Sequence, residues 1–344
     1  MKRIAVIPGD GIGVEVIAQA VRVLKRADEI FGLRLEFIEF DWGADKYLKE
    51  GVTLPAGALD MLRREFDAIL FGAVGDPRVP DNRHAAEILL GMRFGLDLYA
   101  NVRPVKLLDE RLCPLKNARR ESVNFTVVRE NTEGAYVNAG GTFKKGTREE
   151  TAIQEEIHTW KGVERVIDYA FGLATNKVCM SDKSNAMTYA GDLWQRTFKE
   201  VAARYPGIQP SHLYIDALAL LIVQNPSQFE VIVTNNLFGD IVTDLAAALQ
   251  GGLGMAASGN INPVGVSLFE PVHGSSPAMA GKNVANPMGA ILTGGFMLQH
   301  LGFGEAAAAI EAAVVSCIAA DQTTADIGGK LGTREVGGAV VEKL

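Results

Sequence analysis

The chain has 344 residues, of which 48% are hydrophobic and 22% are charged, and these values are typical of a globular protein large enough for two domains. Its 34 Lys and Arg residues against 41 Asp and Glu residues give a net charge of -7, which argues against nucleic acid as a partner. The three cysteines are widely spaced without a metal-ligand pattern, as expected of reduced intracellular thiols. Apolar runs such as 217–223 are too short to span a membrane, and residues 4–7 are too short for a secretory signal. We therefore expect a cytoplasmic protein without a membrane partner.

The N-terminal segment predicts a strand at 3–7, a glycine-rich turn at 8–13 and a helix at 14–27. The glycines follow the pattern G-x-G-x-G instead of the dinucleotide pattern G-x-G-x-x-G. No strand ending in an acidic residue lies clearly at the distance that a dinucleotide fold requires. We interpret this turn as structural and not as a phosphate-binding loop.

Strand and helix signals alternate along the rest of the chain, which predicts an α/β architecture. Strands are expected at 34–40, 68–71, 123–129, 177–180 and 213–216, and helices at 56–64, 163–173 and 188–205. A glycine-interrupted β excursion at 136–146 could form an arm, and the tail at 288–320 is largely helical. No linker composition marks a domain boundary.

The segment 229–244 predicts a buried strand, a turn and a helix beginning at Asp240. Asp240 and Asp244 are four residues apart, so a helix places both carboxylates on one face. Asp240 could cap the helix with Asp244 in its first turns, or both could bind a hard divalent cation. These residues alone favour the capping interpretation.

Three arginines lie beside apolar segments, where an unpaired guanidinium would be costly to bury. They are Arg93, Arg103 and Arg129. A bidentate guanidinium binds carboxylates well, so either a dicarboxylate ligand or internal ion pairs would explain them. Each arginine taken alone is better explained by an internal pair.

Taken together, these segments resemble the β-decarboxylating 2-hydroxyacid dehydrogenases, the family of isocitrate, 3-isopropylmalate, homoisocitrate and tartrate/D-malate dehydrogenases. The resemblance runs nearly end to end and is carried by Ile-Pro-Gly-Asp-Gly-Ile-Gly at 7–13, Asn-Val-Arg-Pro at 101–104, Arg-Glu-Asn-Thr-Glu-Gly at 129–134, Asp-Lys-Ser-Asn at 182–185, Asn-Leu-Phe-Gly-Asp-Ile-Val-Thr-Asp at 236–244 and Glu-Pro-Val-His-Gly-Ser-Ser-Pro at 270–277. It implies the two-domain α/β fold of this family, which is not a Rossmann fold. Residues 1–98 plus 250–344 would form the nucleotide-side domain. Residues 99–249 would form the metal, substrate and dimerisation domain, with a β arm near 136–146.

The resemblance also implies a divalent-metal site and an acid–base pair. Mg²⁺ or Mn²⁺ would be held by Asp216, Asp240 and Asp244, which replaces the capping interpretation. Lys183 matches the general base that acts on the substrate hydroxyl, and Tyr136 matches the residue that protonates the enolate after decarboxylation. In this family Lys183 and Asp216 are supplied across the dimer interface, so the implied active unit is a homodimer with shared active sites.

For the substrate, the resemblance implies a small dicarboxylate held by Arg93, Arg103 and Arg129, with Asp216 also in contact. Leu89 and Leu90 lie in an apolar segment where isocitrate enzymes place a polar residue, and an apolar pocket would fit an isopropyl group. These leucines could equally be ordinary helix core.

The chain is most like 3-isopropylmalate dehydrogenases, which implies NAD-dependent oxidative decarboxylation of (2R,3S)-3-isopropylmalate to 4-methyl-2-oxopentanoate and CO₂ in leucine biosynthesis. Tartrate/D-malate dehydrogenases are the alternative, because the segment 129–134 resembles them too. A non-catalytic nucleotide-binding regulatory subunit is disfavoured, because the metal acids, Lys183 and Tyr136 are all present.

NAD is the expected nucleotide cofactor, although one position departs from the family pattern. The residues that the resemblance places against NAD are Gly72, Ala73, Asn185, Glu270, His273, Gly274, Ser275, Ser276, Pro277, Ala278 and Asn286. NAD-dependent members carry an Asp where this chain has Ala278, and NADP-dependent isocitrate enzymes carry Lys-Tyr where it has Ala278 and Met279. Neither residue supplies a positive charge for a 2′-phosphate. We therefore expect NAD, bound more weakly than in members with the Asp.

Overall fold

The computed structural model describes residues 1–344, which divide into two compact units. Unit 1 contains Met1–Leu98, Arg103–Val123 and Ala247–Leu344, and unit 2 contains Tyr99–Val102 and Asn124–Ala246. The sequence analysis assigned all of 99–249 to one domain, whereas the structure places 103–123 and 247–249 in unit 1. Strand β4 (Ala100–Lys106) begins in unit 2 and ends in unit 1.

Unit 1 is built on a mostly parallel set of strands in the order β2-β1-β3-β12-β11. Their bounds are β1 (Lys2–Gly9), β2 (Leu35–Glu39), β3 (Ala68–Ala73), β11 (Ala257–Ile261) and β12 (Ser267–Pro271). Only the pair β11–β12 among these is antiparallel. Every residue of β3 is buried, as expected of a parallel strand covered on both faces.

Helices cover these strands on both faces. On one side α1, α9, α10 and α11 pack together, and α1 and α9 contact the strands. On the other, α3 and α4 enclose a core that includes Trp42, Leu62, Ile88 and the alternate residues Ile69 and Phe71 of β3. The bounds are α1 (Ile12–Phe31), α2 (Ala44–Glu50), α3 (Ala58–Glu65), α4 (Arg83–Gly95), α9 (Met288–His300), α10 (Gly304–Ala319) and α11 (Thr333–Lys343).

Unit 2 has four parallel strands in the order β5-β10-β8-β9. Helices α5 and α6 pack on each other and against the strands, whereas α7 follows β9 and α8 follows β10. The bounds are β5 (Asn124–Glu130), α5 (Trp160–Leu173), β8 (Lys177–Asp182), α6 (Thr188–Ala202), β9 (Gln209–Tyr214), α7 (Ile215–Gln224), β10 (Val231–Thr234) and α8 (Asn236–Leu249).

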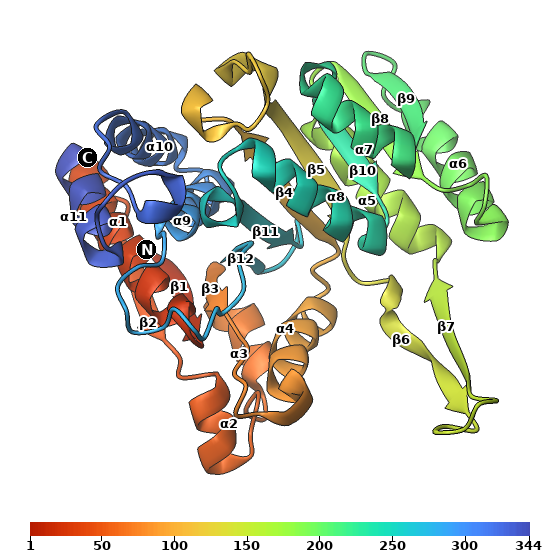
Figure 1. The fold of residues 1–344 in the computed structure, drawn as a ribbon, viewed down its shortest axis with the longest axis horizontal. Coiled ribbons are helices and arrows are strands. Elements are labelled where there is room, and N and C mark those ends of the chain that lie inside the picture. The colour runs from red at the N-terminus through yellow and green to blue at the C-terminus, as the bar shows by residue number, and fades with distance from the viewer. The chain divides into compact units, whose positions relative to one another are not determined.

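A two-stranded antiparallel arm extends from unit 2 (Figure 1). It consists of β6 (Gly134–Phe143) and β7 (Thr151–Ile157). Its sequence predicted the first strand, but the polar composition of β7 gave no comparable signal. The arm exposes Phe143 and Ile153. No helix of the structure has the length and apolar character needed to cross a membrane.

Two expected boundaries were wrong, and both concern acidic residues. Helix α8 begins at Asn236 and not at Asp240, so Asp240 lies in the second turn and does not cap the helix. The strand expected at 213–216 ends at Tyr214, so Asp216 lies in the first turn of α7. Each helix therefore starts directly after a parallel strand.

Candidate active site

The carboxyl ends of the unit 2 strands carry most of the predicted catalytic residues. Arg129 lies near the end of β5, Lys183 follows β8, Asp216 follows β9 and Asn236 follows β10. Because parallel strands end at the same edge of a sheet, these residues collect at one edge. Ligands of open α/β sheets bind outside this edge.

Arg129, Tyr136 and Asp240 form one cluster at this edge. Arg129 is almost completely buried and makes an ion pair with Asp240 through Nη1. The hydroxyl of Tyr136 donates to the other Asp240 oxygen, Oδ2, at 2.7 Å. The Arg129 guanidinium also lies 5.1 Å from the centre of the Tyr136 ring. Burial raises the pKa of Tyr136 above its ordinary value, and the hydrogen bond to Asp240 adds to the shift.

The start of α8 is shaped to hold Arg129. Asn236 Oδ1 accepts hydrogen bonds from Arg129 Nε at 3.0 Å and from Nη2 at 2.7 Å. At Gly239 a Cβ atom would lie 2.5 Å from Arg129 Cγ. The absence of a side chain at Gly239 therefore lets the aliphatic part of Arg129 pack against α8. Asn236, Gly239 and Asp240 of this one helix all contact Arg129.

Lys183 and Asp216 form a second cluster. Lys183 Nζ lies 2.7 Å from Asp216 Oδ1, and this contact lowers the pKa of Asp216 below its ordinary value. The neighbouring Asp182 anchors the turn, because its carboxylate accepts from Ser184 N at 3.1 Å and lies 2.8 Å from His212 Nε2. At Gly191 a Cβ atom would lie 2.4 Å from Ser184 Cα, so α6 needs glycine there to approach this turn.

The three predicted metal ligands do not come together within one chain. No group of three or more His, Cys, Asp or Glu side chains is arranged to hold a metal ion. Asp240 and Asp244 lie one turn apart on α8, whereas Asp216 is on α7 beside Lys183. The donor set is nevertheless all oxygen, which fits Mg²⁺ or Mn²⁺. Asn185 follows the Lys183 turn and is exposed.

In unit 1, Arg93 is held by Glu270 of β12. Arg93 Nη2 lies 3.0 Å from Glu270 Oε1, which also accepts from Asn260 Nδ2 at 2.8 Å. Arg93 Nε is buried without a hydrogen-bond partner in the protein. Internal ion pairs thus satisfy some of the guanidinium nitrogens of Arg93 and Arg129. The buried Nε of Arg93 is still able to donate to a ligand carboxylate. Arg103 is also buried.

The apolar segment before Arg93 lies on α4. Ile88 is fully buried in the core beneath α3 and α4, so it is a packing residue. Leu89 and Leu90 are both only half-buried, and Leu89 packs against the edge of this core. Surface thus remains on Leu89 and Leu90 that a substrate could contact.

The loop at 273–277, which the resemblance places against NAD, is braced by the N-terminal turn. Ile12 N donates to Ser275 O at 2.8 Å, and a Cβ atom at Gly11 would lie 2.0 Å from that oxygen. The glycine therefore packs the turn against the loop. His273 Nε2 is buried without a hydrogen-bond partner, and burial lowers the pKa of this imidazole. A neutral ring with one uncommitted nitrogen fits an adenine ring.

Most of the other predicted nucleotide residues lie in this loop or elsewhere in unit 1. Asn286 is buried and donates to Asp326 Oδ2 at 3.0 Å, which fixes its amide. Ser276 has a positive φ of 37°, and Gly274, Pro277 and Ala278 are exposed. Gly72 and Ala73 end the buried strand β3, where a Cβ atom at Gly72 would lie 2.0 Å from Pro8 O.

Sequence reasoning missed the role of Asp10, although it lies in a recognised segment. Its carboxylate accepts from Ala44 N at 2.7 Å and from Gly75 N at 2.8 Å, and lies 2.9 Å from His84 Nε2. Asp10 and His84 are both buried. This network joins the N-terminal turn to the loop after β3. The one feature of the sequence that could have indicated this role is the position of Asp10 between two glycines.

Comparison with known proteins identifies the family of the chain. The family described as isocitrate/isopropylmalate dehydrogenase matches residues 3–340. The chain belongs to this family. It is therefore a dehydrogenase, and the enzyme class inferred from the sequence motifs is confirmed.

Two similar relatives align with almost the whole length of this chain. One is the 3-isopropylmalate dehydrogenase of Thermobifida fusca, 45% identical over 99% of this chain and 97% of the relative. Another is the 3-isopropylmalate dehydrogenase of Rhodococcus erythropolis, 46% identical over 99% of this chain and 100% of the relative.

Solved structures confirm the predicted fold class of a two-domain isocitrate/isopropylmalate dehydrogenase. The isocitrate dehydrogenase of Methylococcus capsulatus superposes with a TM-score of 0.88 at 35% identity, covering 100% of this chain and 99% of that chain. A β-decarboxylating dehydrogenase from Thermococcus kodakarensis superposes with a TM-score of 0.83 at 36% identity, covering 100% of this chain and 96% of that chain.

Proposed function

We propose that the enzyme catalyses the NAD-dependent oxidative decarboxylation of (2R,3S)-3-isopropylmalate to 4-methyl-2-oxopentanoate and CO₂, a step of leucine biosynthesis. The observation that carries the proposal is the near-complete coverage, at 45% and 46% identity, of relatives named 3-isopropylmalate dehydrogenase. Leu89 and Leu90 support it, because both retain exposed apolar surface beside Arg93. An isopropyl group would gain stabilisation from that surface.

Lys183 would accept the proton of the substrate hydroxyl as hydride leaves the adjacent carbon. An amine acts as a base only when it is unprotonated, so Lys183 must lose its proton before each turnover. Asp216, 2.7 Å away, positions the lysine side chain. Asp182 and Gly191 support the same role by fixing the turn that carries Lys183.

Tyr136 would return a proton to carbon after CO₂ has left. Its raised pKa supports this role, because the hydroxyl keeps its proton at neutral pH. Arg93, Arg103 and Arg129 would bind the two substrate carboxylates and orient the leaving group. Burial strengthens each of these contacts, because all three guanidinium groups are largely shielded from water.

Asp240 and Asp244 of one chain with Asp216 of a second would hold Mg²⁺ or Mn²⁺, which when bound would acidify the substrate hydroxyl and polarise the ketone. The nucleotide-side residues fit NAD through the buried Nε2 of His273 and the fixed amide of Asn286. We assign the nucleotide to unit 1 and the metal carboxylates to unit 2.

A homodimer would complete each site, because the acidic residues of one chain form no three-carboxylate group. Exposed apolar side chains on unit 2 support this assembly. They include Phe143 and Ile153 of the arm, Leu220 of α7 and Ile241 of α8, the last 61% exposed. The unpaired cysteines are consistent with the reducing cytoplasm as the location of the dimer.

The test is a comparison of kcat/KM for 3-isopropylmalate, D-malate, tartrate and isocitrate, each with Mg²⁺ or Mn²⁺ and with NAD or NADP. We expect 3-isopropylmalate with NAD to have the highest value. Leu89→Ser should lower kcat/KM for 3-isopropylmalate by about 10-fold or more and leave D-malate nearly unchanged, since one apolar contact gives roughly 1–3 kcal/mol of discrimination. A higher value for D-malate or tartrate would assign the leucines to packing and overturn the proposed substrate.

A further inference from the structure

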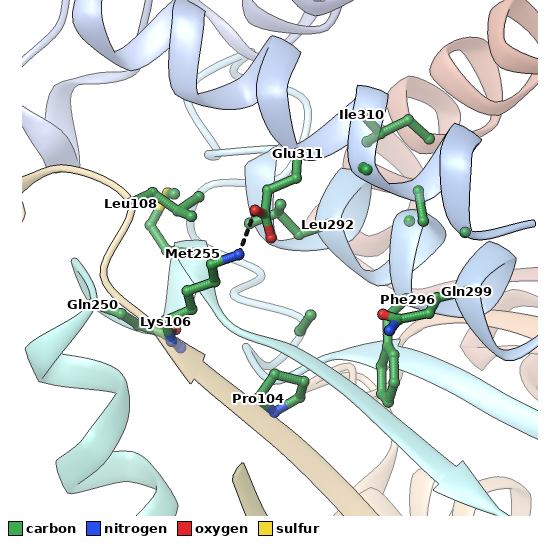
Figure 2. Close-up of a pocket in the computed structure, with 15 residues that line it drawn as sticks. Pro104, Lys106, Leu108, Gln250, Met255, Leu292, Phe296, Gln299, Ile310 and Glu311 are labelled. Atoms are coloured by element: carbon green, nitrogen blue, oxygen red, sulfur yellow. Dashed lines mark hydrogen bonds and ion pairs between the residues drawn. The ribbon is translucent and has the colours of Figure 1, made fainter. Parts of the chain in front are cut away.

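Unit 1 contains a cavity of about 300 Å³ that includes none of the predicted active-site residues. It lies between β4, the residues around β11 and the helices α9 and α10 (Figure 2). The cavity is partly open to solvent, and the side chains of Lys106 and Glu311 that line it are 44% and 38% exposed. A space of this size is at the lower end of the range for small-molecule pockets.

The inner surface of the cavity is aliphatic and aromatic. Met255, Leu292, Phe296 and Ile310 contribute side chains from α9, α10 and the segment before β11. Small residues complete the lining, because Gly295, Gly304, Ala307 and Ala308 also border the cavity and contribute no bulky side chain. Such a surface would bury a short hydrocarbon chain and release it from water.

One ion pair is the charged feature of this cavity. Lys106 Nζ of β4 lies 2.5 Å from Glu311 Oε1 of α10, and Figure 2 shows the two side chains meeting between Met255 and Leu292. Their side chains are 44% and 38% exposed, so the pair gains little from its mutual attraction. Lys106 and Glu311 can therefore each bind a charged group of a ligand with little loss of stability from weakening their own ion pair.

The geometry points to a binding site for a small aliphatic amino acid. The ligand carboxylate would bind Lys106, its ammonium would bind Glu311, and its side chain would occupy the apolar wall beside Phe296. A simple carboxylate would meet the negative charge of Glu311, and a simple amine would meet the positive charge of Lys106. Only a ligand with both charges satisfies the pair while filling the apolar space.

This inference does not depend on the proposed reaction, because binding can be measured without substrate or nucleotide. Isothermal titration of the full-length enzyme with L-leucine, 4-methylpentanoate, 3-methylbutylamine and glycine separates the contributions of the two charges and the side chain. We expect L-leucine to bind at least about tenfold more tightly than each of the other three, because each lacks a charged contact or the apolar group. Lys106→Met and Glu311→Gln should each weaken L-leucine binding by a similar factor.

Lys2→Met is the matched control, because Lys2 pairs with Asp67 at the surface of the same unit with a similar exposure of 40%. It should leave L-leucine binding unchanged, and melting temperatures would establish that every variant folds. Absence of L-leucine binding, or equal binding to the Lys106→Met variant, would overturn the inference. Equally tight binding of 4-methylpentanoate would overturn the amino-acid class, and a change of oligomeric state in Lys106→Met would assign the cavity to a second copy of the chain.

Discussion

Tyr136 and Asp240 illustrate how a buried contact sets the state of a reacting group. The hydrogen bond of 2.7 Å and the burial of the ring both favour the protonated phenol, so its pKa is raised above 10.0. We predict that Tyr136→Phe lowers kcat by about 10²–10⁴-fold, the usual contribution of a general acid, with a much smaller change in KM. Initial rates of NADH formation measure both constants.

The direction of the pKa shift also predicts a pH dependence. Because the phenol ionises above its ordinary value of 10.0, wild-type kcat should not fall through loss of the Tyr136 proton below about pH 10. A decline centred near neutral pH that disappears in Tyr136→Phe would contradict this assignment. A decline that persists in the variant belongs to another group.

Ala278 supports a second prediction at the scale of a single residue. It is exposed in the loop after Pro277, where a carboxylate could accept from the ribose hydroxyls of NAD. We predict that Ala278→Asp lowers the dissociation constant for NAD by about 10-fold, because a charged hydrogen bond contributes roughly 1.5–3 kcal/mol. The same charge should weaken NADP binding by repelling its 2′-phosphate. Fluorescence titration measures both, and an unchanged NAD constant would refute the proposed position of the ribose.

At the scale of an element, α8 depends on close contact with β5. Gly239 is buried, and a Cβ atom there would lie 2.5 Å from Arg129 Cγ and 2.6 Å from its Cβ. We predict that Gly239→Ala destabilises the protein by about 1–3 kcal/mol, because overpacking outweighs the better helix propensity of alanine. It should also lower turnover, because Arg129 is displaced from Asp240.

Gly172 of α5 provides the matched control for Gly239. A Cβ atom there would meet nothing within 4 Å, so Gly172→Ala should stabilise the helix by about 0.5–1 kcal/mol and leave turnover unchanged. Urea unfolding and initial rates measure the two effects. Similar stability changes in both variants would show that α8 can shift without strain.

The arm is the element whose apolar residues most clearly need a partner. Phe143 is 61% exposed near the end of β6, and a two-stranded ribbon alone is marginally stable in water. If the proposed homodimer buries this side chain, we predict that Phe143→Asp shifts it toward monomer by about 10-fold or more in sedimentation, because a buried unpaired carboxylate is costly. Val264→Asp, at a position 97% exposed in unit 1, should have no effect. Dissociation in neither variant would exclude the arm from the interface.

For the whole molecule, the alternation of strand and helix signals predicted the α/β class, whereas the two-domain fold was implied by the family resemblance. Strands such as β7, β11 and β12 were not predicted. The short run of β-branched apolar residues in β10 and the amphipathic pattern of α1 located these two elements, although α1 runs from Ile12 to Phe31 where 14–27 was expected. The start of α8 was missed because Asn236 and Gly239 have low helix propensity, although here they hold Arg129. The structure thus follows a tertiary requirement against the local preference.

The side-chain pairs of the site could not be predicted from the sequence. Lys183 and Asp216 are 33 residues apart, and Arg129 and Asp240 are 111 apart, so no periodic pattern relates them. The motifs identified the reacting residues, but only the folded chain separates them into two clusters. The same holds for the Lys106–Glu311 pair, whose residues are 205 apart.

This separation into two clusters makes a prediction about assembly. If each site combines Lys183 and Asp216 of one chain with Arg129, Tyr136 and Asp240 of another, two inactive variants can complement each other. Lys183→Ala and Asp240→Asn should each be nearly inactive as homodimers, whereas the purified mixed dimer should regain activity at the one site that receives only wild-type residues. Co-expression with two affinity tags yields the mixed dimer, and NADH formation measures its turnover.

The pairing of Lys183 with Asp216 supplies the control for this experiment. Because these residues lie 2.7 Å apart in one chain, both would enter the same site together. A mixed dimer of Lys183→Ala and Asp216→Asn should therefore have one damaged residue at every site and remain inactive. No recovery in the first mixture would indicate that each site is built from a single chain, and the metal carboxylates would then have to meet by movement within that chain. Recovery in this control would instead show that the Lys183 and the Asp216 of one site come from different chains, against their contact within one chain.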